Sequence, residues 1–94
     1  MKDCGDKAVS AGEHTTLILN DIKIVNSIMG IVAKDSAKIT VYKYLNKNSK
    51  GCMHAYRGKN IYNGAVINIK KDEFNCGKSK IEFDKFSKIE YFNE

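Results

Sequence analysis

The sequence predicts an all-β, or β-rich α+β, domain: a small antiparallel barrel-like or curled sheet of about six to eight short strands, with at most one short helix. Eleven isoleucines against three leucines favour strands, because β-branched side chains pack well on pleated surfaces and lose rotamer freedom in helices. Several segments alternate apolar and polar residues with a period of two, as strands do. Gly, Asn and Asp separate them in a chain that has no proline.

The chain of 94 residues is long enough for one domain with a thin core. Residues 1–13 are polar and show no apolar period, which predicts a flexible N-terminal arm. Residues 14–94 are predicted to form a single β-rich domain.

Residues 15–33 are dense in β-branched and aliphatic side chains, and Asn20 and Asn26 interrupt them. This pattern predicts two or three short strands. A buried helix over residues 22–32 is the alternative. Gly30 and the β-branched neighbours count against that helix, since each lowers intrinsic helix stability.

The middle of the chain is predicted to be a three-stranded meander. Residues 38–45 alternate, residues 46–51 form a polar loop, and residues 52–56 form the second strand. Residues 57–60 form a short connection, after which residues 61–71 alternate again.

The C-terminal segment repeats itself after eight residues. Lys80-Ile81-Glu82-Phe83 returns as Lys88-Ile89-Glu90-Tyr91. In a strand the two apolar residues of each copy share one face, whereas in a helix they would scatter, so two short strands joined by a turn are predicted.

Two hairpin registers would give the meander two defined faces. We expect Leu45 to oppose Cys52, and Tyr56 to oppose Ile61. The core face then holds Ile39, Val41, Leu45, Cys52, Tyr56, Ile61, Ala65, Ile67 and Ile69, interrupted by Lys43 and His54. The outer face holds Thr40, Tyr42, Tyr44, Met53, Ala55, Arg57, Tyr62, Gly64, Val66, Asn68 and Lys70.

Positive charge is concentrated in the middle of the chain. Residues 36–71 contain eight Lys and Arg and no Asp or Glu, although the whole chain has a formal charge of +5. A field of one sign favours an anionic partner. Aromatic rings on a sheet, with cations around them, suit unpaired nucleic acid, because bases stack on the rings while lysines neutralise phosphates.

The predicted function is therefore binding without catalysis, with single-stranded nucleic acid or a nucleotide as the ligand. One alternative is a small interaction or inhibitor protein, of bacterial or phage origin, that docks on an acidic partner surface. A second alternative is a metal-independent ribonuclease. The predicted ligand-binding residues are Tyr42, Tyr44, Tyr62, Arg57, Lys59, Lys70, Lys47 and Lys50.

Catalytic and metal-binding motifs do not stand out. Cys52 and His54 lie too close in sequence for a usual zinc knuckle, so no metal or cofactor is expected. The ribonuclease alternative uses His54, Tyr56, Arg57 and Lys59 as acid, base and phosphate-binding groups. The predicted faces separate His54 from Arg57, which argues against this alternative.

The sequence also favours a cytoplasmic protein without a membrane segment. The first residues lack the apolar stretch of a secretory signal, and no run is long enough to span a bilayer. Three cysteines, Cys4, Cys52 and Cys76, form no disulfide framework, so free thiols are expected.

Overall fold

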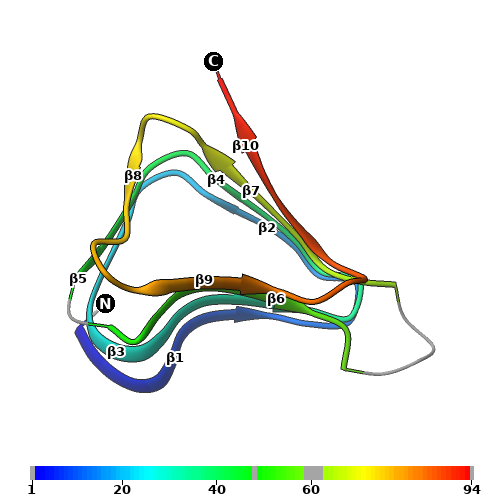
Figure 1. Cartoon of the computed structure of the whole chain (residues 1–94), viewed down its shortest axis with the longest axis horizontal. Helices are drawn as coiled ribbons and strands as arrows, with labels where there is room; N and C mark the ends of the chain where they lie inside the picture. The colour runs from blue at the N-terminus through cyan, green and yellow to red at the C-terminus, as the bar shows by residue number, and fades with distance from the viewer. Residues whose placement is uncertain (1, 48, 59–62, 94) are drawn as a thin grey trace.

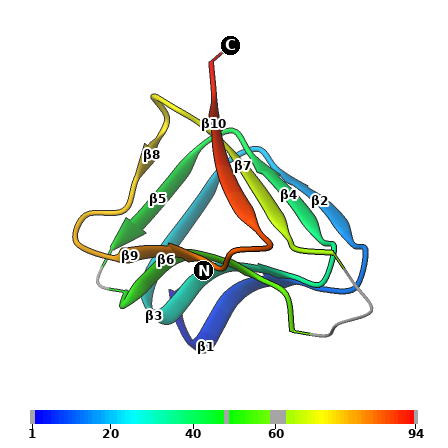
Figure 2. The same ribbon diagram turned by 45° about the vertical axis from the view of Figure 1, so that its right-hand side comes forward.

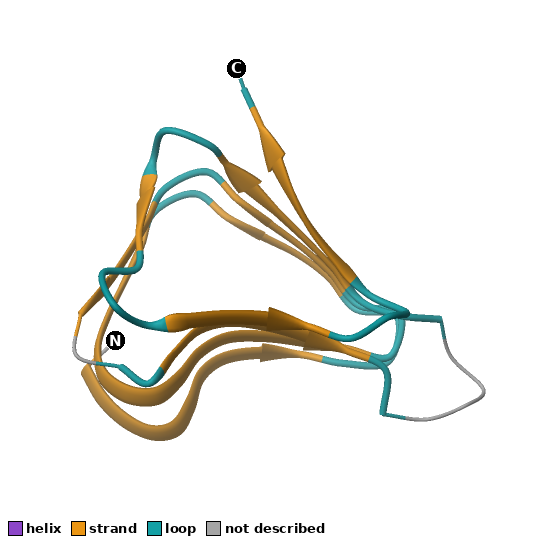
Figure 3. Cartoon of the chain, viewed as in Figure 1, coloured by secondary structure: helices purple, strands orange, loops and turns teal. Residues whose placement is uncertain are grey.

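The protein consists of parallel β-strands. The computed structural model describes residues 2–47, 49–58 and 63–93, and in these residues it contains strands and no helix (Figure 3). Every strand pair found there is parallel. The strands are β1 (Lys2–Ala11), β2 (Thr16–Leu19), β3 (Ile22–Lys34), β4 (Lys38–Val41), β5 (Tyr44–Lys47), β6 (Gly51–Tyr56), β7 (Val66–Lys70), β8 (Phe74–Asn75), β9 (Lys80–Phe83) and β10 (Lys88–Phe92).

The chain winds around a triangular cross-section (Figures 1 and 2). One face, the first face, carries the second halves of β1 and β3, followed by β6 and β9. The second face carries β2, β4, β7 and β10, and the third face carries the first half of β3, β5 and β8. Because β3 bends across two faces, the first and third faces belong to one six-stranded sheet. This arrangement is a parallel β-helix.

Equivalent positions recur every 22 residues in the first coils. Val9, Ile31 and Met53 are paired in register on the first face, and Ile18 is paired with Thr40 on the second. Thr40 and Asn68 are also paired but lie 28 residues apart. The extra residues belong to the connection between β6 and β7, so this coil is lengthened at a corner of the triangle.

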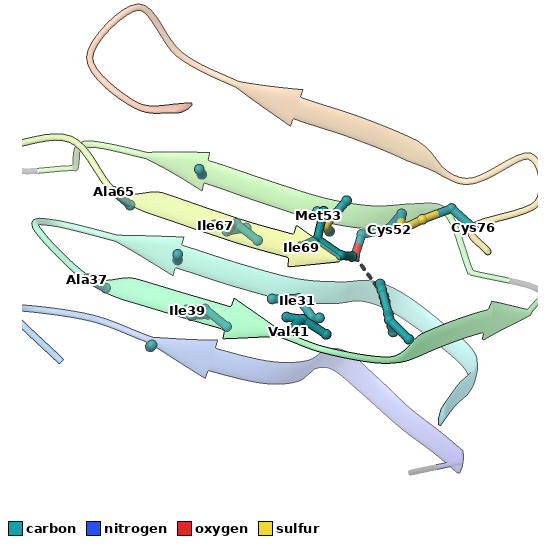
Figure 4. Close-up of a cluster of buried hydrophobic side chains, with 14 of the residues drawn as sticks. Ile31, Ala37, Ile39, Val41, Cys52, Met53, Ala65, Ile67, Ile69 and Cys76 are labelled. Atoms are coloured by element: carbon teal, nitrogen blue, oxygen red, sulfur yellow. Dashed lines mark hydrogen bonds between the residues drawn. A yellow bond between two sulfur atoms is a disulfide. The ribbon is translucent and has the colours of Figure 1, made fainter. Parts of the chain in front are cut away.

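Columns of aliphatic side chains fill the interior. Ile39 stacks beneath Ile67, and Val41 beneath Ile69 (Figure 4), and all four side chains are fully buried. Burying a side chain of this size contributes about 1.5 to 3 kcal/mol. The period-two pattern in these segments therefore reports one inward face per strand.

The predicted antiparallel barrel-like or curled sheet is wrong, although the all-β class is confirmed. Alternation identifies a strand and its buried face, but it carries no information about the direction of the neighbouring strand. Residues 46–51 were predicted as a hairpin loop, but Asn46 and Lys47 end β5 on the third face and Gly51 begins β6 on the first. The partners of each strand lie about one coil away in sequence, so the predicted Leu45–Cys52 pairing does not form. The Tyr56–Ile61 pairing involves a residue outside the described part.

The assignment of side chains to two faces was correct only in part. Ile39, Val41, Cys52, Ala65, Ile67 and Ile69 are buried as predicted, whereas Leu45 and Tyr56 are only half-buried. Tyr44, Met53 and Ala55 were placed outside and are buried. The corner at Tyr42 and Lys43 explains why Tyr44 was assigned to the wrong face. Val41 and Tyr44 both face inward, so the alternation of inward and outward residues is interrupted at this corner.

Cys52 and Cys76 form a disulfide, with their Cα atoms 5.7 Å apart (Figure 4). The expectation of free thiols is therefore wrong for these two residues. Disulfides are typical of oxidising compartments, so the cysteines lend no support to the predicted cytoplasmic location. None of the described segments is a helix long and apolar enough to cross a bilayer. The segment predicted as a flexible arm contains β1.

Candidate anion-binding groove

The predicted tyrosines do not share one surface in the described part of the chain. Tyr42 lies half-buried at the corner between β4 and β5, where its ring and that of Phe92 pack in a T-shaped arrangement at a centroid distance of 5.6 Å. Tyr44 lies inside the β-helix and is 2% exposed. A ligand could stack on the Tyr44 ring only if that ring left the core. Tyr62 and Lys59 lie outside the described residues.

Arg57 and Lys70 are also separated from each other. The Arg57 guanidinium lies 3.5 Å from the centre of the Phe86 ring, and its backbone N–H donates to the Asp84 carboxylate at 2.8 Å. Burial alone would raise the pKa of Asp84, but the hydrogen bonds from Arg57 and its other neighbours lower it. Lys70 lies on the second face, in register with Phe92.

Lys47 and Lys50 do come together, and two further lysines join them. All four line a groove of about 780 Å³ at the corner between the third and first faces. Lys47 is the last residue of β5 and Lys50 directly precedes β6, while Lys78 lies in the corner before β9 and Lys80 is the first residue of β9. Glu82 is the one acidic residue among the described lining residues.

The two walls of the groove are joined through their backbones. The Lys80 N–H donates to the Lys50 carbonyl at 3.0 Å. The Ser79 hydroxyl donates to the Ser49 carbonyl at 2.6 Å. The disulfide between Cys52 and Cys76 adds a covalent link beside them. The lysine side chains therefore extend from a backbone that is cross-linked between neighbouring coils.

A buried hydrogen-bond network lies behind the groove wall. The Tyr44 hydroxyl donates to the Cys52 carbonyl at 2.8 Å. The Asn46 amide donates to that hydroxyl at 2.7 Å and to the Gly51 carbonyl at 3.3 Å. Burial raises the pKa of Tyr44 to about 12, and the Asn46 hydrogen bond only partly opposes this. Gly30 makes room for the network, since a Cβ there would overlap the Tyr44 hydroxyl and the Cys52 carbonyl.

Replacing Tyr44 by Phe should therefore lower the free energy of unfolding by about 1 to 2 kcal/mol, because buried polar groups lose their partner. Urea denaturation of Tyr44→Phe against the wild type measures this loss. Tyr91→Phe is the matched control, since Tyr91 is 48% exposed and should change stability little. Equal effects in both variants would contradict the role of the network.

Because the folded chain holds the Tyr44 proton more tightly, wild-type stability should also fall as the pH rises from about 10 towards about 12.

The described residues of the ribonuclease alternative lie on both sides of the point where β6 ends and the chain turns a corner of the β-helix. His54 and Tyr56 lie side by side on the first face, with ring centroids 4.8 Å apart. Arg57 is at the corner and stacks on Phe86, and Lys59 is outside the described residues. In the described part, no group of three or more His, Cys, Asp or Glu side chains could hold a metal ion.

No protein-family model, curated protein or solved structure matches the chain. Function is therefore inferred from the groove itself. Sequence reasoning found Lys47 and Lys50 but missed Lys78 and Lys80, because these follow the acid-free block and the parallel register alone brings them alongside. The signal available in the sequence was the Lys78-Ser79-Lys80 triplet that follows Cys76.

Proposed function

We propose that the protein binds a phosphate-bearing anion, either a nucleotide or a short stretch of single-stranded nucleic acid, in the lysine groove and without catalysis. The observation that carries the proposal is the convergence of Lys47, Lys50, Lys78 and Lys80 on one groove that holds a single described carboxylate. Four ammonium groups against Glu82 leave a local charge of +3. The predicted cytoplasmic location and bacterial or phage origin form no part of this support.

Lysine suits such a ligand because its ammonium group is a compact point charge with three donors. It attracts phosphate without the fixed two-point geometry of arginine, so it tolerates several phosphate positions. Counterion release makes this kind of binding strongly dependent on salt. We therefore expect affinity that falls steeply with ionic strength.

The groove also limits how the rest of the ligand is held. Its volume of about 780 Å³ lies within the range of roughly 300 to 1,000 Å³ typical of small-molecule sites. Its apolar lining consists of aliphatic and thioether side chains such as Ile28, Met29 and Leu45, and the described lining has no aromatic ring. Bases would therefore gain little stacking, and discrimination between bases should be weak.

Reversing one lysine on each wall tests the proposal. Lys50→Glu combined with Lys78→Glu should weaken binding of labelled single-stranded DNA and RNA by about tenfold or more at low salt, since each substitution replaces an attraction with a repulsion. Fluorescence anisotropy measures the affinity at two salt concentrations, with unlabelled nucleotide as a competitor and duplex DNA for comparison.

The matched control is Lys38→Glu combined with Lys71→Glu. Both lysines are exposed, both belong to the acid-free block, and neither lines the groove. The control changes the net charge by the same amount, so near wild-type affinity would assign binding to the groove. Equal losses in both double variants would indicate attraction by net charge alone. Wild-type binding that is absent, or insensitive to salt, would contradict the proposal and favour docking on a protein partner.

A further inference from the structure

The C-terminal end of the β-helix has no covering layer in the described structure. β8, β9 and β10 are the last strands of the third, first and second faces, and each pairs with a strand on one side only (Figure 2). Large apolar side chains are exposed there. They are Ile81 (36%), Phe83 (58%), Phe86 (47%) and Tyr91 (48%).

Three of these side chains occupy positions that are interior in the preceding coil. Ile81 is in register with Met53, Phe83 with Ala55, and Tyr91 with Ile69, and all three partners are fully buried. Paired residues of neighbouring strands point to the same side of a sheet. The hydrophobic interior therefore continues to this end of the molecule and meets solvent there. Unpaired strand edges of this kind readily accept another strand.

The charge order of β9 is complementary to itself. If two copies of β9 paired antiparallel about Ile81, Lys80 of each copy would lie opposite Glu82 of the other, and the two Ile81 residues would meet. A register centred on Glu82 would instead place two carboxylates face to face. The sequence of β9 thus favours one antiparallel register over its neighbour.

The order of the three edge strands fits the same symmetry. A twofold axis through the middle of β9 exchanges the faces that carry β8 and β10. β8 precedes β9 in the chain and β10 follows it, each across a four-residue corner, residues 76–79 and 84–87. Along the axis of the β-helix, the winding of the chain places β8 nearer the N-terminal end than β9, and β10 farther from that end. After the rotation, β10 of one copy would therefore meet β8 of the other. One rotation would cover all three edges.

Charge does not oppose this contact. Residues 80–93 contain Lys80, Lys85 and Lys88 against Glu82, Asp84 and Glu90, so their formal charges cancel although the whole chain carries +5. We propose that the protein forms a symmetric dimer, in which two copies join end to end through antiparallel pairing of β9. An isologous contact of this kind is closed, so assembly stops at two copies.

Charge exchange on β9 tests the dimer, with mass measured by sedimentation over a concentration series and without ligand. The wild type should reach twice the chain mass of 10.6 kDa. Lys80→Glu alone and Glu82→Lys alone should each weaken dimerisation by about tenfold or more, because like charges then face each other at two symmetric positions. An equimolar mixture of the two variants should restore the dimer, since each chain then meets the opposite charge.

Circular dichroism of each variant checks folding, which exposed positions on β9 should preserve. A wild type that stays monomeric would overturn the proposal, as would single variants that dimerise normally or a mixture that stays monomeric. Masses that grow beyond two chains would indicate head-to-tail stacking and also overturn it. Lys80 and Glu82 line the lysine groove as well, so the readout is mass alone and its outcome is independent of the proposed ligand binding.

Discussion

Gly64→Ala should destabilise the fold by about 3 kcal/mol or more, because overpacking against a fixed backbone leaves no inexpensive relaxation. A Cβ at Gly64 would overlap the carbonyl of Phe86 and crowd the backbone nitrogen of Ser87 in the next coil. The next residue, Ala65, donates its N–H to the Ser87 hydroxyl at 2.9 Å, so the two coils are in direct contact here. Urea denaturation followed by circular dichroism measures the loss.

Gly58→Ala is the matched control at the same corner. A Cβ there would meet the Asp35 carboxylate at 3.4 Å, which is an ordinary contact distance. We expect a change within about 0.5 kcal/mol. If Gly64→Ala were as mild as this control, the close approach of the two corners would be wrong.

Removing the Cys52–Cys76 disulfide should lower the free energy of unfolding by about 3 to 3.5 kcal/mol, because the bond joins two residues that are 24 positions apart and closes a loop in the unfolded chain. The combined Cys52→Ser and Cys76→Ser variant and the reduced wild type should show the same loss in urea. Affinity for single-stranded nucleic acid should fall as well, since the bond links the two walls of the lysine groove.

Cys4→Ser is the control for this experiment, since it leaves the Cys52–Cys76 pair and removes the remaining thiol. Its unfolding midpoint should match that of the oxidised wild type and should drop on reduction. If the reducing agent changed the unfolding midpoint of neither the wild type nor Cys4→Ser, the disulfide would not form in solution.

The strands were more predictable than their arrangement. Alternation located the strands at Lys38–Val41, Val66–Lys70 and Lys88–Phe92, because each alternates apolar with polar residues. The alternating apolar residues are buried in the first two strands and lie at the exposed end of the β-helix in the third. Strand direction was not predictable, since the pairing partner lies a coil away and only apolar character repeats. Leu17, Ile39 and Ile67 occupy equivalent positions in neighbouring strands, but the amino acids next to them in the sequence differ. The eight-residue echo in the tail was easier to see than this longer period, although it marks two different faces.

The site was predictable to the extent that it is local in sequence. Lys47 and Lys50 lie three residues apart within the basic block. Lys78 and Lys80 lie beyond acidic residues, so a linear charge count excluded them. Tyr44 was misplaced because the corner at Tyr42 and Lys43 changes which side of the chain faces inward. The positions of the corners and the registers of the strands depend on contacts between coils, so the pattern within a single strand does not predict them.

The buried Tyr44–Asn46 pair also bears on how the chain avoids misfolding. Coils with similar aliphatic columns could stack one repeat out of step, and hydrophobic burial alone would penalise such a slip only weakly. The hydroxyl of Tyr44 fits because position 30 has no side chain and the Cys52 carbonyl accepts its proton. A shifted stack would bring a different residue to that place and bury these polar groups without partners. The buried hydrogen bonds of Tyr44 and Asn46, set among aliphatic side chains, thus favour a single alignment of the coils.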